Sequence, residues 1–135
     1  MPHLTTIDVR FSELDPYGHV NHAVYPTYLE VGRTGALNAC GVAIDRLLAD
    51  GIQLVVTRLE IDYRGAATMG DRLTVRTGLE ELGRVRGRWR QEIRRDGDLL
   101  IRAAVTAAVT DSRGRPTRPP AWLFASLHPL LDWKT

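Results

Sequence analysis

The stretch Asp15-Pro16-Tyr17-Gly18-His19-Val20-Asn21-His22 separates two different sequence patterns. Before it, residues 4–12 alternate between apolar and polar side chains, which predicts a strand with one face formed by Ile7, Val9 and Phe11. The strand is expected to end at this stretch because proline fixes φ and glycine permits a tight turn. The pattern after it is helical, so this short segment is where the predicted chain changes from strand to helix.

A long helix is predicted to follow. Asn21 can cap its N-terminus, Pro26 is tolerated only in a first turn, and Gly41 is a natural stop after its last turn. The side chains in between are apolar nearly all round, and the main interruptions are Glu30, Arg33 and Asn38. Such a helix is expected to be mostly buried.

The remaining sequence predicts one short helix and then four strands. The helix covers about residues 43–49 and ends at Asp50-Gly51, after which the pattern has period two. The strands are expected at 52–63, 72–80, between Gly83 and Asp96-Gly97, and at 99–110, with a weak helical turn at 121–127. One strand, one long helix and four further strands predict an α+β fold, an antiparallel sheet around a central helix.

Composition limits the class of protein. The 135 residues are 44% hydrophobic and 25% charged, which predicts one domain over 1–135, with 119–135 as a C-terminal tail. Cys40 is the only cysteine, so no intrachain disulfide or multi-cysteine zinc site is expected. No apolar run reaches the ~18 residues of a membrane span, and residues 1–6 lack the pattern of a signal peptide. We therefore expect a cytoplasmic protein without a membrane partner.

The net charge is small, but the basic residues are almost all arginine. Eighteen basic residues against sixteen acidic ones argue against a nucleic-acid partner. Lys134 is the only lysine, so seventeen of the basic residues are arginine. Four of them, at positions 84, 86, 88 and 90, would share one face of a strand. That face is either exposed to solvent with glutamates nearby or a binding site for the phosphates of a ligand.

The opening stretch also carries the residue types of a reactive site. It gathers a carboxylate, two imidazoles and a side-chain amide at the start of the predicted helix. Backbone N–H groups at a helix N-terminus lack intrahelical partners and can polarise a carbonyl. A carboxylate beside them can act as a nucleophile or as a general base on water. The other interpretation is a capped turn in which the histidines only fill space.

The segment from Phe11 to His22, with Tyr25, Tyr28 and Glu30, resembles the opening motif of the 4-hydroxybenzoyl-CoA thioesterase-like hotdog proteins. The resemblance continues through four later pieces in the expected order: Glu60-Ile61-Asp62-Tyr63, Gly70-Asp71-Arg72-Leu73, Arg94-Arg95-Asp96-Gly97 and Asp111-Ser112-Arg113-Gly114-Arg115-Pro116. It implies a hotdog fold, in which a curved five-stranded antiparallel sheet wraps a long central helix. It also implies hydrolysis of acyl-CoA or acyl-carrier-protein thioesters without a metal or bound cofactor, in a homodimer or homotetramer whose active site lies between subunits.

The resemblance also implies roles for individual residues. Asp15 corresponds to the family's catalytic acid and His22 to a histidine of the branch that acts on short or aromatic acyl groups. The carbonyl-polarising amide falls near His22 and Ala23. Asn21 and Tyr25 are expected beside the substrate, and the phosphates of coenzyme A are expected at Arg84 and Arg86.

Three functions therefore remain open: an acyl-CoA thioesterase, an acyl-carrier-protein thioesterase, and a non-catalytic hotdog protein that binds an acyl ligand. The third is retained because the branch with the histidine usually has a tyrosine four residues before the aspartate. Phe11 occupies that position here and lacks the hydroxyl.

Overall fold

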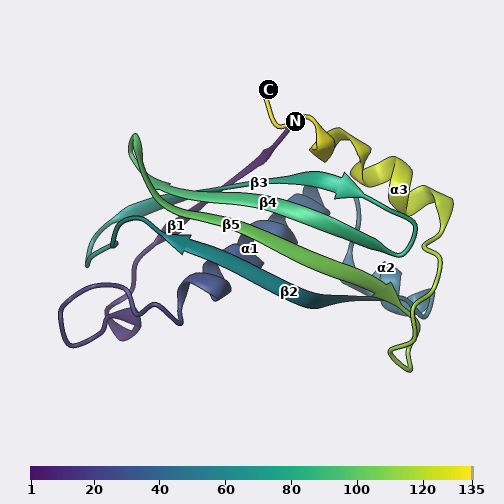
Figure 1. Ribbon diagram of the computed structural model, residues 1–135, viewed down its shortest axis with the longest axis horizontal. Coiled ribbons are helices and arrows are strands. Elements are labelled where there is room, and N and C mark those ends of the chain that lie inside the picture. Colours follow the sequence, from purple (N-terminus) through teal and green to yellow (C-terminus); the bar gives the residue numbers. More distant parts are fainter. Residues whose placement is uncertain (135) are drawn as a thin grey trace.

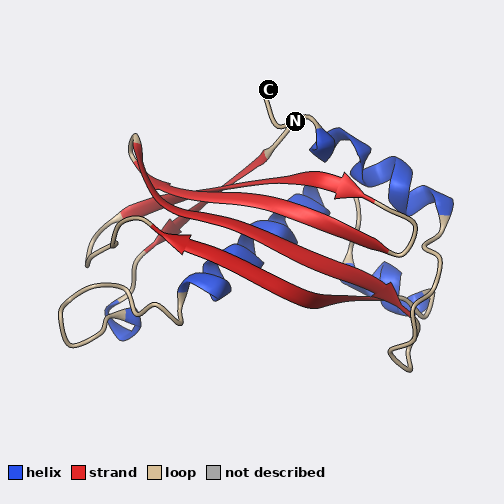
Figure 2. Ribbon diagram, in the orientation of Figure 1, coloured by secondary structure: helices blue, strands red, loops and turns tan. Residues whose placement is uncertain are grey.

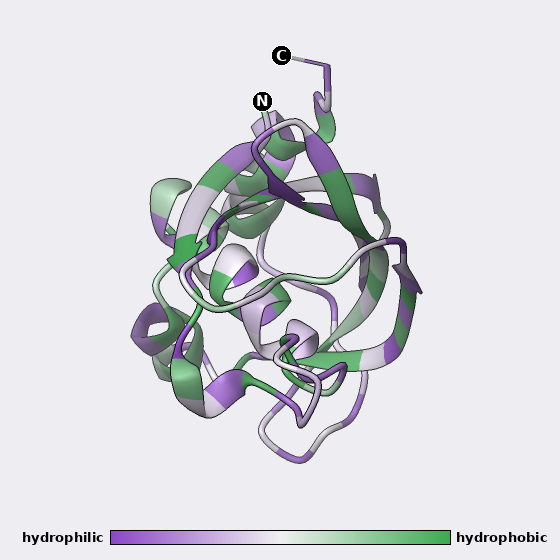
Figure 3. Cartoon of the chain, turned by 90° about the vertical axis from the view of Figure 1, so that its left-hand side faces the viewer, coloured by the Kyte–Doolittle hydropathy of each residue, from purple (hydrophilic) through white to green (hydrophobic). Residues whose placement is uncertain are grey.

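A five-stranded antiparallel sheet wraps around one long helix in the computed structural model, which describes residues 1–134 (Figures 1 and 2). The strands are β1 (His3–Asp8), β2 (Gln53–Tyr63), β3 (Arg72–Leu82), β4 (Arg86–Arg95) and β5 (Asp98–Thr110), in the order β1-β3-β4-β5-β2. The helices are α1 (Tyr25–Ala39), α2 (Ile44–Ala49) and α3 (Ala121–Leu127). Viewed from the end of the molecule, the sheet curves around α1 (Figure 3). The predicted α+β hotdog arrangement is confirmed.

The first strand differs from its prediction. It ends at Asp8, and Phe11–Glu13 form a 3-10 turn in place of the strand's last residues. Val9 makes the last contact with the sheet by donating its N–H to the carbonyl of Asp71. Phe11 is 77% exposed and lies outside β1, so the predicted continuation of this strand through Phe11 is wrong. The chain turns away there because the Arg10 N–H bonds the Glu13 side chain, 2.8 Å away, instead of a neighbouring strand.

The start of α1 also corrects the sequence analysis. Asn21 is not the helix cap: the helix begins at Tyr25, with Val24 in the capping position. Pro26 explains the later start, because it lacks the N–H that a helix beginning at Asn21 would need from it. Instead, the Asn21 side chain accepts the Ala23 N–H at 2.9 Å and closes a turn before the helix. The predicted end is confirmed, with Gly41 at a positive φ of 76°.

The helix packs closely against the concave face of the sheet. Leu29 and Ala36 are fully buried there, and a Cβ added to Gly32 would lie 2.6 Å from Val75 Cγ1 and 2.7 Å from Thr77 Oγ1. The opposite side of the helix, including Glu30, Val31, Thr34 and Asn38, is exposed. The helix is therefore less buried within one chain than its apolar composition predicts.

A bulge in β2 decides which of its side chains face the helix. The register against β5 shifts between Val56 and Arg58. Leu54 and Val56 line a groove with α1 before the bulge, and Leu59 does so after it. An extra residue reverses the alternation of a strand, so both apolar sets can face the same side. The alternating pattern of β2 alone does not show which of its side chains face inward; the position of the bulge does.

The C-terminal segment is more ordered than the single weak turn predicted for it. Helix α3 is followed by a 3-10 helix at His128–Leu131, and the two bury Leu123, Leu127 and Leu130. They belong to the same apolar cluster as Leu79 and Trp89 of the sheet. Within residues 1–134, no helix combines the length and the apolar character that a membrane crossing requires.

Replacing Gly32 with alanine tests the close approach of α1. Alanine normally stabilises an exposed helix position by about 1 kcal/mol relative to glycine. Here the added methyl group would overlap Val75 and Thr77, so we expect the free energy of unfolding to fall by about 1–3 kcal/mol. Asn38→Ala on the exposed side of α1 is the control and should leave stability unchanged or raise it. A Gly32→Ala variant as stable as the wild type in urea denaturation would contradict this packing.

Candidate active site

Asp15 lies in a tight loop that holds its carboxylate by backbone hydrogen bonds. Its Oδ1 atom accepts the N–H of Tyr17 at 2.9 Å and the N–H of His19 at 3.1 Å. Its own N–H donates to the carbonyl of His19 at 2.7 Å, and Gly18 takes a φ of +80° within the turn. No hydrogen bond to the other oxygen, Oδ2, is found within residues 1–134. One oxygen thus fixes the orientation of a partly exposed carboxylate, and the other has no hydrogen-bond partner among the described residues.

His22 and Ala23 lie in the short turn between this loop and α1. The Ala23 N–H is occupied, because it donates to the Asn21 side chain. The N–H of His22 has no acceptor in the described part of the chain, and the His22 side chain is exposed. Of the two backbone amides expected from the sequence, only that of His22 is therefore ready to bind a carbonyl oxygen.

Tyrosines beneath the turn hold it in position. The Tyr63 hydroxyl, from the end of β2, donates to the His22 carbonyl at 2.9 Å. Tyr25 is only 2% exposed, and its hydroxyl accepts the Ala67 N–H at 3.1 Å. Its ring packs edge-on against Tyr28 and Tyr63, with centroids 5.9 and 5.7 Å apart. Tyr25 supports the turn from below, and its contact with a substrate stays a prediction.

Glu13 is a support that the sequence analysis did not single out. It is 8% exposed and accepts the Tyr28 hydroxyl at 2.8 Å, which ties the segment before Asp15 to α1. Burial alone would raise the pKa of Glu13, but hydrogen bonds from the Arg10 backbone and the Tyr28 hydroxyl lower it overall. Burial and the neighbouring carboxylate raise the pKa of Tyr28. Only the fold reveals this pair, because the two residues are fifteen positions apart.

The connection between β2 and β3 supports the loop from its other side. The Val20 N–H donates to the Ala67 carbonyl at 2.8 Å, and His19 forms an isolated β-bridge with Thr68. Asp71 holds this connection by accepting the Thr68 N–H and pairing with Arg95, both at 2.8 Å. The hydrogen bond from Arg95, followed by that of Thr68, lowers the pKa of Asp71.

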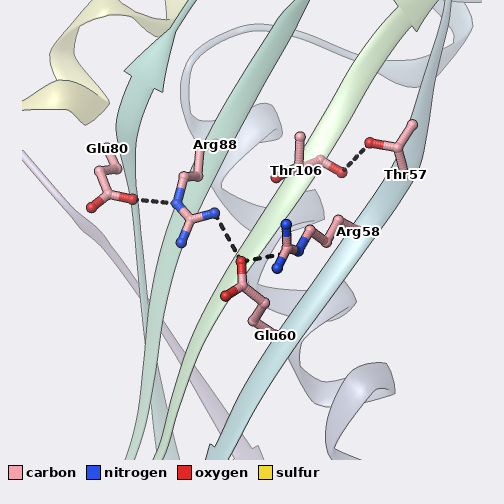
Figure 4. A network of polar contacts seen from close by, with 6 residues as sticks. All are labelled: Thr57, Arg58, Glu60, Glu80, Arg88 and Thr106. Atoms are coloured by element: carbon pink, nitrogen blue, oxygen red, sulfur yellow. Dashed lines mark hydrogen bonds and ion pairs between the residues drawn. The ribbon is translucent and has the colours of Figure 1, made fainter.

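Of the four arginines predicted to share one strand face, at positions 84, 86, 88 and 90, one lies outside the strand. Arg84 lies in the turn before β4, so only Arg86, Arg88 and Arg90 belong to the strand. The turn is tight, because the Gly83 N–H bonds the Arg86 carbonyl, and it leaves no room for the strand to begin earlier. Arg88 is paired with Glu80 at 2.6 Å and with Glu60 at 2.9 Å (Figure 4). The glutamate-paired interpretation is correct for this residue.

Arg84 and Arg86 are exposed, and neither has an ion-pair partner within residues 1–134. They lie at the end of the sheet where β3 turns into β4, whereas the Asp15 loop lies beyond the opposite end (Figure 1). One chain therefore brings Asp15, Asn21, His22, Ala23 and Tyr25 together and leaves the two arginines apart from them. No cluster of three or more metal-binding side chains occurs in residues 1–134.

A family model described as the thioesterase-like superfamily matches residues 9–127, which include the Asp15 loop, the helix and all of β2–β5. The chain belongs to this superfamily. The broad family named from the opening motif is thereby confirmed, and its 4-hydroxybenzoyl-CoA branch stays a prediction.

Two curated relatives are thioesterases by name. The chain is 31% identical over 121 residues to the chloroplastic acyl-acyl carrier protein thioesterase ATL2 of Arabidopsis thaliana. That match covers 88% of this chain and 64% of ATL2, so the chain spans less than two thirds of this relative. It is 33% identical over 109 residues to the long-chain acyl-CoA thioesterase FadM of Escherichia coli K12, covering 79% of this chain and 82% of FadM.

A solved structure extends the likeness to three dimensions. A thioesterase from Thermus thermophilus, determined in complex with coenzyme A and zinc, superimposes with a TM-score of 0.81 at 29% identity. The match covers 95% of this chain and 92% of the other. The superfamily relation therefore extends to nearly the whole backbone of both chains.

Glu13→Gln tests the support beneath Asp15. The lowered pKa means that the ionised form of Glu13 stabilises the fold above about pH 4.5, its unfolded value, and that this contribution is lost as pH falls through the folded value. We expect Glu13→Gln to lower the free energy of unfolding at pH 7 by about 1–3 kcal/mol. The deficit should shrink as the pH falls below about 4.5.

Urea denaturation at several pH values measures this difference, with the exposed Glu81→Gln as the matched control. A deficit that stays constant from pH 7 to pH 3 would contradict the assignment of an ionised, stabilising Glu13.

Proposed function

We propose that this chain is an acyl-CoA thioesterase that hydrolyses a thioester to a free acid and coenzyme A. The observation that carries the proposal is the Asp15 carboxylate, which two backbone N–H groups orient and whose Oδ2 atom has no hydrogen bond within residues 1–134. It lies in the loop that leads to the turn before α1, where the His22 N–H has no acceptor within residues 1–134. The named activities of FadM and of the coenzyme A-bound thioesterase support the same reaction.

In the proposed reaction, the thioester carbonyl oxygen accepts the N–H of His22 in the turn before α1. This donor stabilises the negative charge that develops on the oxygen, and donors of this kind are typically worth about 3 kcal/mol. Asp15 Oδ2 then either attacks the carbonyl carbon or takes a proton from a water molecule that attacks it.

Collapse of the tetrahedral intermediate breaks the carbon–sulfur bond, and coenzyme A leaves as its thiolate. In the nucleophilic route, water then hydrolyses the anhydride between Asp15 and the acyl group. The net change in both routes is one water consumed, with one acid and one thiol formed. The exposed imidazole of His22 is free to protonate the thiolate or to orient the substrate.

We also propose that the complete site forms in a homodimer, or in a homotetramer built from such dimers. β2 is an edge strand, and its side chains Val55, Val56 and Leu59 are 39–48% exposed. Antiparallel pairing of two copies of β2 would set the Arg84 end of one sheet beside the Asp15 end of the other. Arg84 and Arg86 of one copy could then bind the phosphates of a substrate at Asp15 of its partner.

A second candidate is hydrolysis of acyl groups on a carrier protein. The relative ATL2, named for this activity, favours it. In this case Arg84 and Arg86 would contact acidic side chains of the carrier rather than nucleotide phosphates. A non-catalytic acyl-binding protein is the outcome if neither thioester is hydrolysed.

Asp15→Asn tests the reaction. Asparagine keeps an oxygen that accepts the N–H groups of Tyr17 and His19, so the loop should remain intact. It is neither a carboxylate nucleophile nor an effective base, so we expect kcat to fall by about 100-fold or more. Thiol release is followed with a chromogenic thiol reagent on a panel from short and aromatic to long acyl-CoA.

The matched control is Asp50→Asn, an exposed aspartate at the end of α2, which should retain full activity. If Asp15→Asn hydrolyses the preferred substrate at the wild-type rate, Asp15 is not the catalytic group. If the wild-type protein binds acyl-CoA but hydrolyses no member of the panel, the chain is a binding protein.

Arg84→Gln and Arg86→Gln distinguish the two thioesters. If coenzyme A is the carrier of the acyl group, each change should raise KM for acyl-CoA by roughly three- to tenfold with little effect on kcat, because only binding to remote phosphates is lost. Arg88→Gln is the control, because this arginine is already paired with Glu80 and Glu60. Assays with the same acyl group on coenzyme A and on a carrier protein complete the comparison. If the KM values for acyl-CoA and for the acyl-carrier protein are unchanged in both variants, these arginines do not bind the substrate.

A further inference from the structure

An apolar pocket lies between helix α3 and the end of the sheet where β3 turns into β4 (Figure 1). Leu82 and Trp89 line it from the sheet, and Leu123, Phe124 and Leu127 line it from the helix. It encloses about 40 Å³ by a measure on which one water molecule needs about 10–15 Å³. We call this space the α3 pocket. It is narrow and apolar, so it suits a hydrocarbon chain better than a bulky polar group.

Helix α3 is attached to the sheet by apolar side chains. Leu123 and Leu127 are buried against it, and no hydrogen bond between α3 and a strand occurs within residues 1–134. Apolar contacts have no directional requirement. The helix can therefore shift slightly to admit a ligand without breaking a hydrogen bond to the sheet.

Arg86 is the only residue with a charged side chain among those that line the pocket within residues 1–134. It is exposed as well, so its side chain lies where the pocket meets solvent. Its carbonyl accepts the Gly83 N–H at 2.8 Å, which fixes its backbone in the turn. Its guanidinium has no ion-pair partner in the described part of the chain. The pocket thus combines an apolar interior with an unpaired cation at its mouth.

This combination fits a molecule with a hydrocarbon tail and an anionic head. A carboxylate can form two parallel hydrogen bonds with a guanidinium, while the tail leaves water for the apolar interior. The adenine ring of a nucleotide fits less well, because its nitrogen atoms would give up their hydrogen bonds to water and Arg86 is the one charged partner there. An inorganic anion would leave the apolar interior unused.

We propose that the α3 pocket binds an alkyl-chain carboxylate, with its tail between α3 and the sheet and its head group paired with Arg86. Binding itself does not depend on the reaction. Its consequence for the reaction rests on the proposed function, in which hydrolysis releases a free acid and Arg86 also binds the phosphates of the substrate. The acid then competes with the substrate for Arg86, and hydrolysis slows as the product accumulates.

Calorimetric titration tests the site without any thioester. Butanoate, hexanoate and octanoate share one head group, and we expect the dissociation constant to fall by about fourfold for each methylene group that becomes buried. 1-Octanol is the probe that has the same tail without the charge. Octanoate should bind more tightly than 1-octanol to the wild-type protein, because only octanoate can pair with Arg86.

Two variants separate the head group from the tail. Arg86→Gln should raise the dissociation constant of octanoate by about three- to tenfold and leave that of 1-octanol unchanged. Phe124→Trp adds volume at a half-buried lining position and should weaken both ligands at least tenfold. The matched controls are Arg64→Gln, an exposed arginine after β2, and Ala125→Leu on the exposed side of α3, and both should bind like the wild type.

Affinity that does not depend on chain length, or octanoate binding by folded Arg86→Gln and Phe124→Trp that equals the wild type, would overturn the proposal. If Phe124→Trp does not fold by circular dichroism, Phe124→Ala takes its place. This variant widens the pocket and should extend the gain in affinity to longer chains, and an unchanged dependence on chain length counts against the site.

Hydrolysis is assayed separately. In the wild type, octanoate should raise the apparent KM for acyl-CoA and leave kcat unchanged, and Phe124→Trp should remove this inhibition. Octanoate that binds as expected to a protein without thioesterase activity counts against the proposed function alone. An active enzyme that binds no octanoate counts against the α3 pocket alone.

Discussion

The close approach of α1 to the sheet at Gly32 is the constraint on which the rest of the structure depends. No side chain separates the helix from Val75 and Thr77 at this point, and buried Gln91 bonds both the helix and β3. The helix is therefore held at one depth in the curved sheet. Its N-terminus lies where Tyr25 can bond the β2–β3 connection, and its exposed flank lies beside the edge of β2. Both the candidate site and the candidate interface follow from that position.

The Asp15 loop shows how a fold can orient a carboxylate without burying it. The loop is fixed from three sides: its own backbone, the Glu13–Tyr28 bond to α1, and the contacts of Val20 and His19 with the β2–β3 connection. The rigidity comes from neutral backbone bonds and from a carboxylate that is not itself at the site. Asp15 therefore keeps one oxygen available, which suits a nucleophile or base better than a fully satisfied carboxylate would.

The arginines differ in the partners that the fold gives them. Most of those with described partners contact carboxylates, as Arg88 does with Glu60 and Glu80, or stack on an aromatic ring, as Arg90 does on Trp133. These need no ligand to explain them. Seven others have no such partner within residues 1–134: Arg33, Arg64, Arg84, Arg86, Arg102, Arg113 and Arg118. Of these, Arg84 and Arg86 lie at the end of the sheet that is far from Asp15. In the proposed dimer, these two arginines lie beside the Asp15 loop of the other copy.

The sequence by itself determined the order of helices and strands, the turn at Asp15 and the end of α1, because alternation, proline and glycine act through local geometry. Tertiary structure alone decided where Phe11 points, how far Asn21 is from the helix start, and that Arg84 lies outside its strand. It also revealed the support from Glu13 and the uncompensated charge of Arg33. These depend on contacts between residues distant in the chain, such as Glu13 with Tyr28 and Arg33 with Gln91, for which local patterns carry no signal.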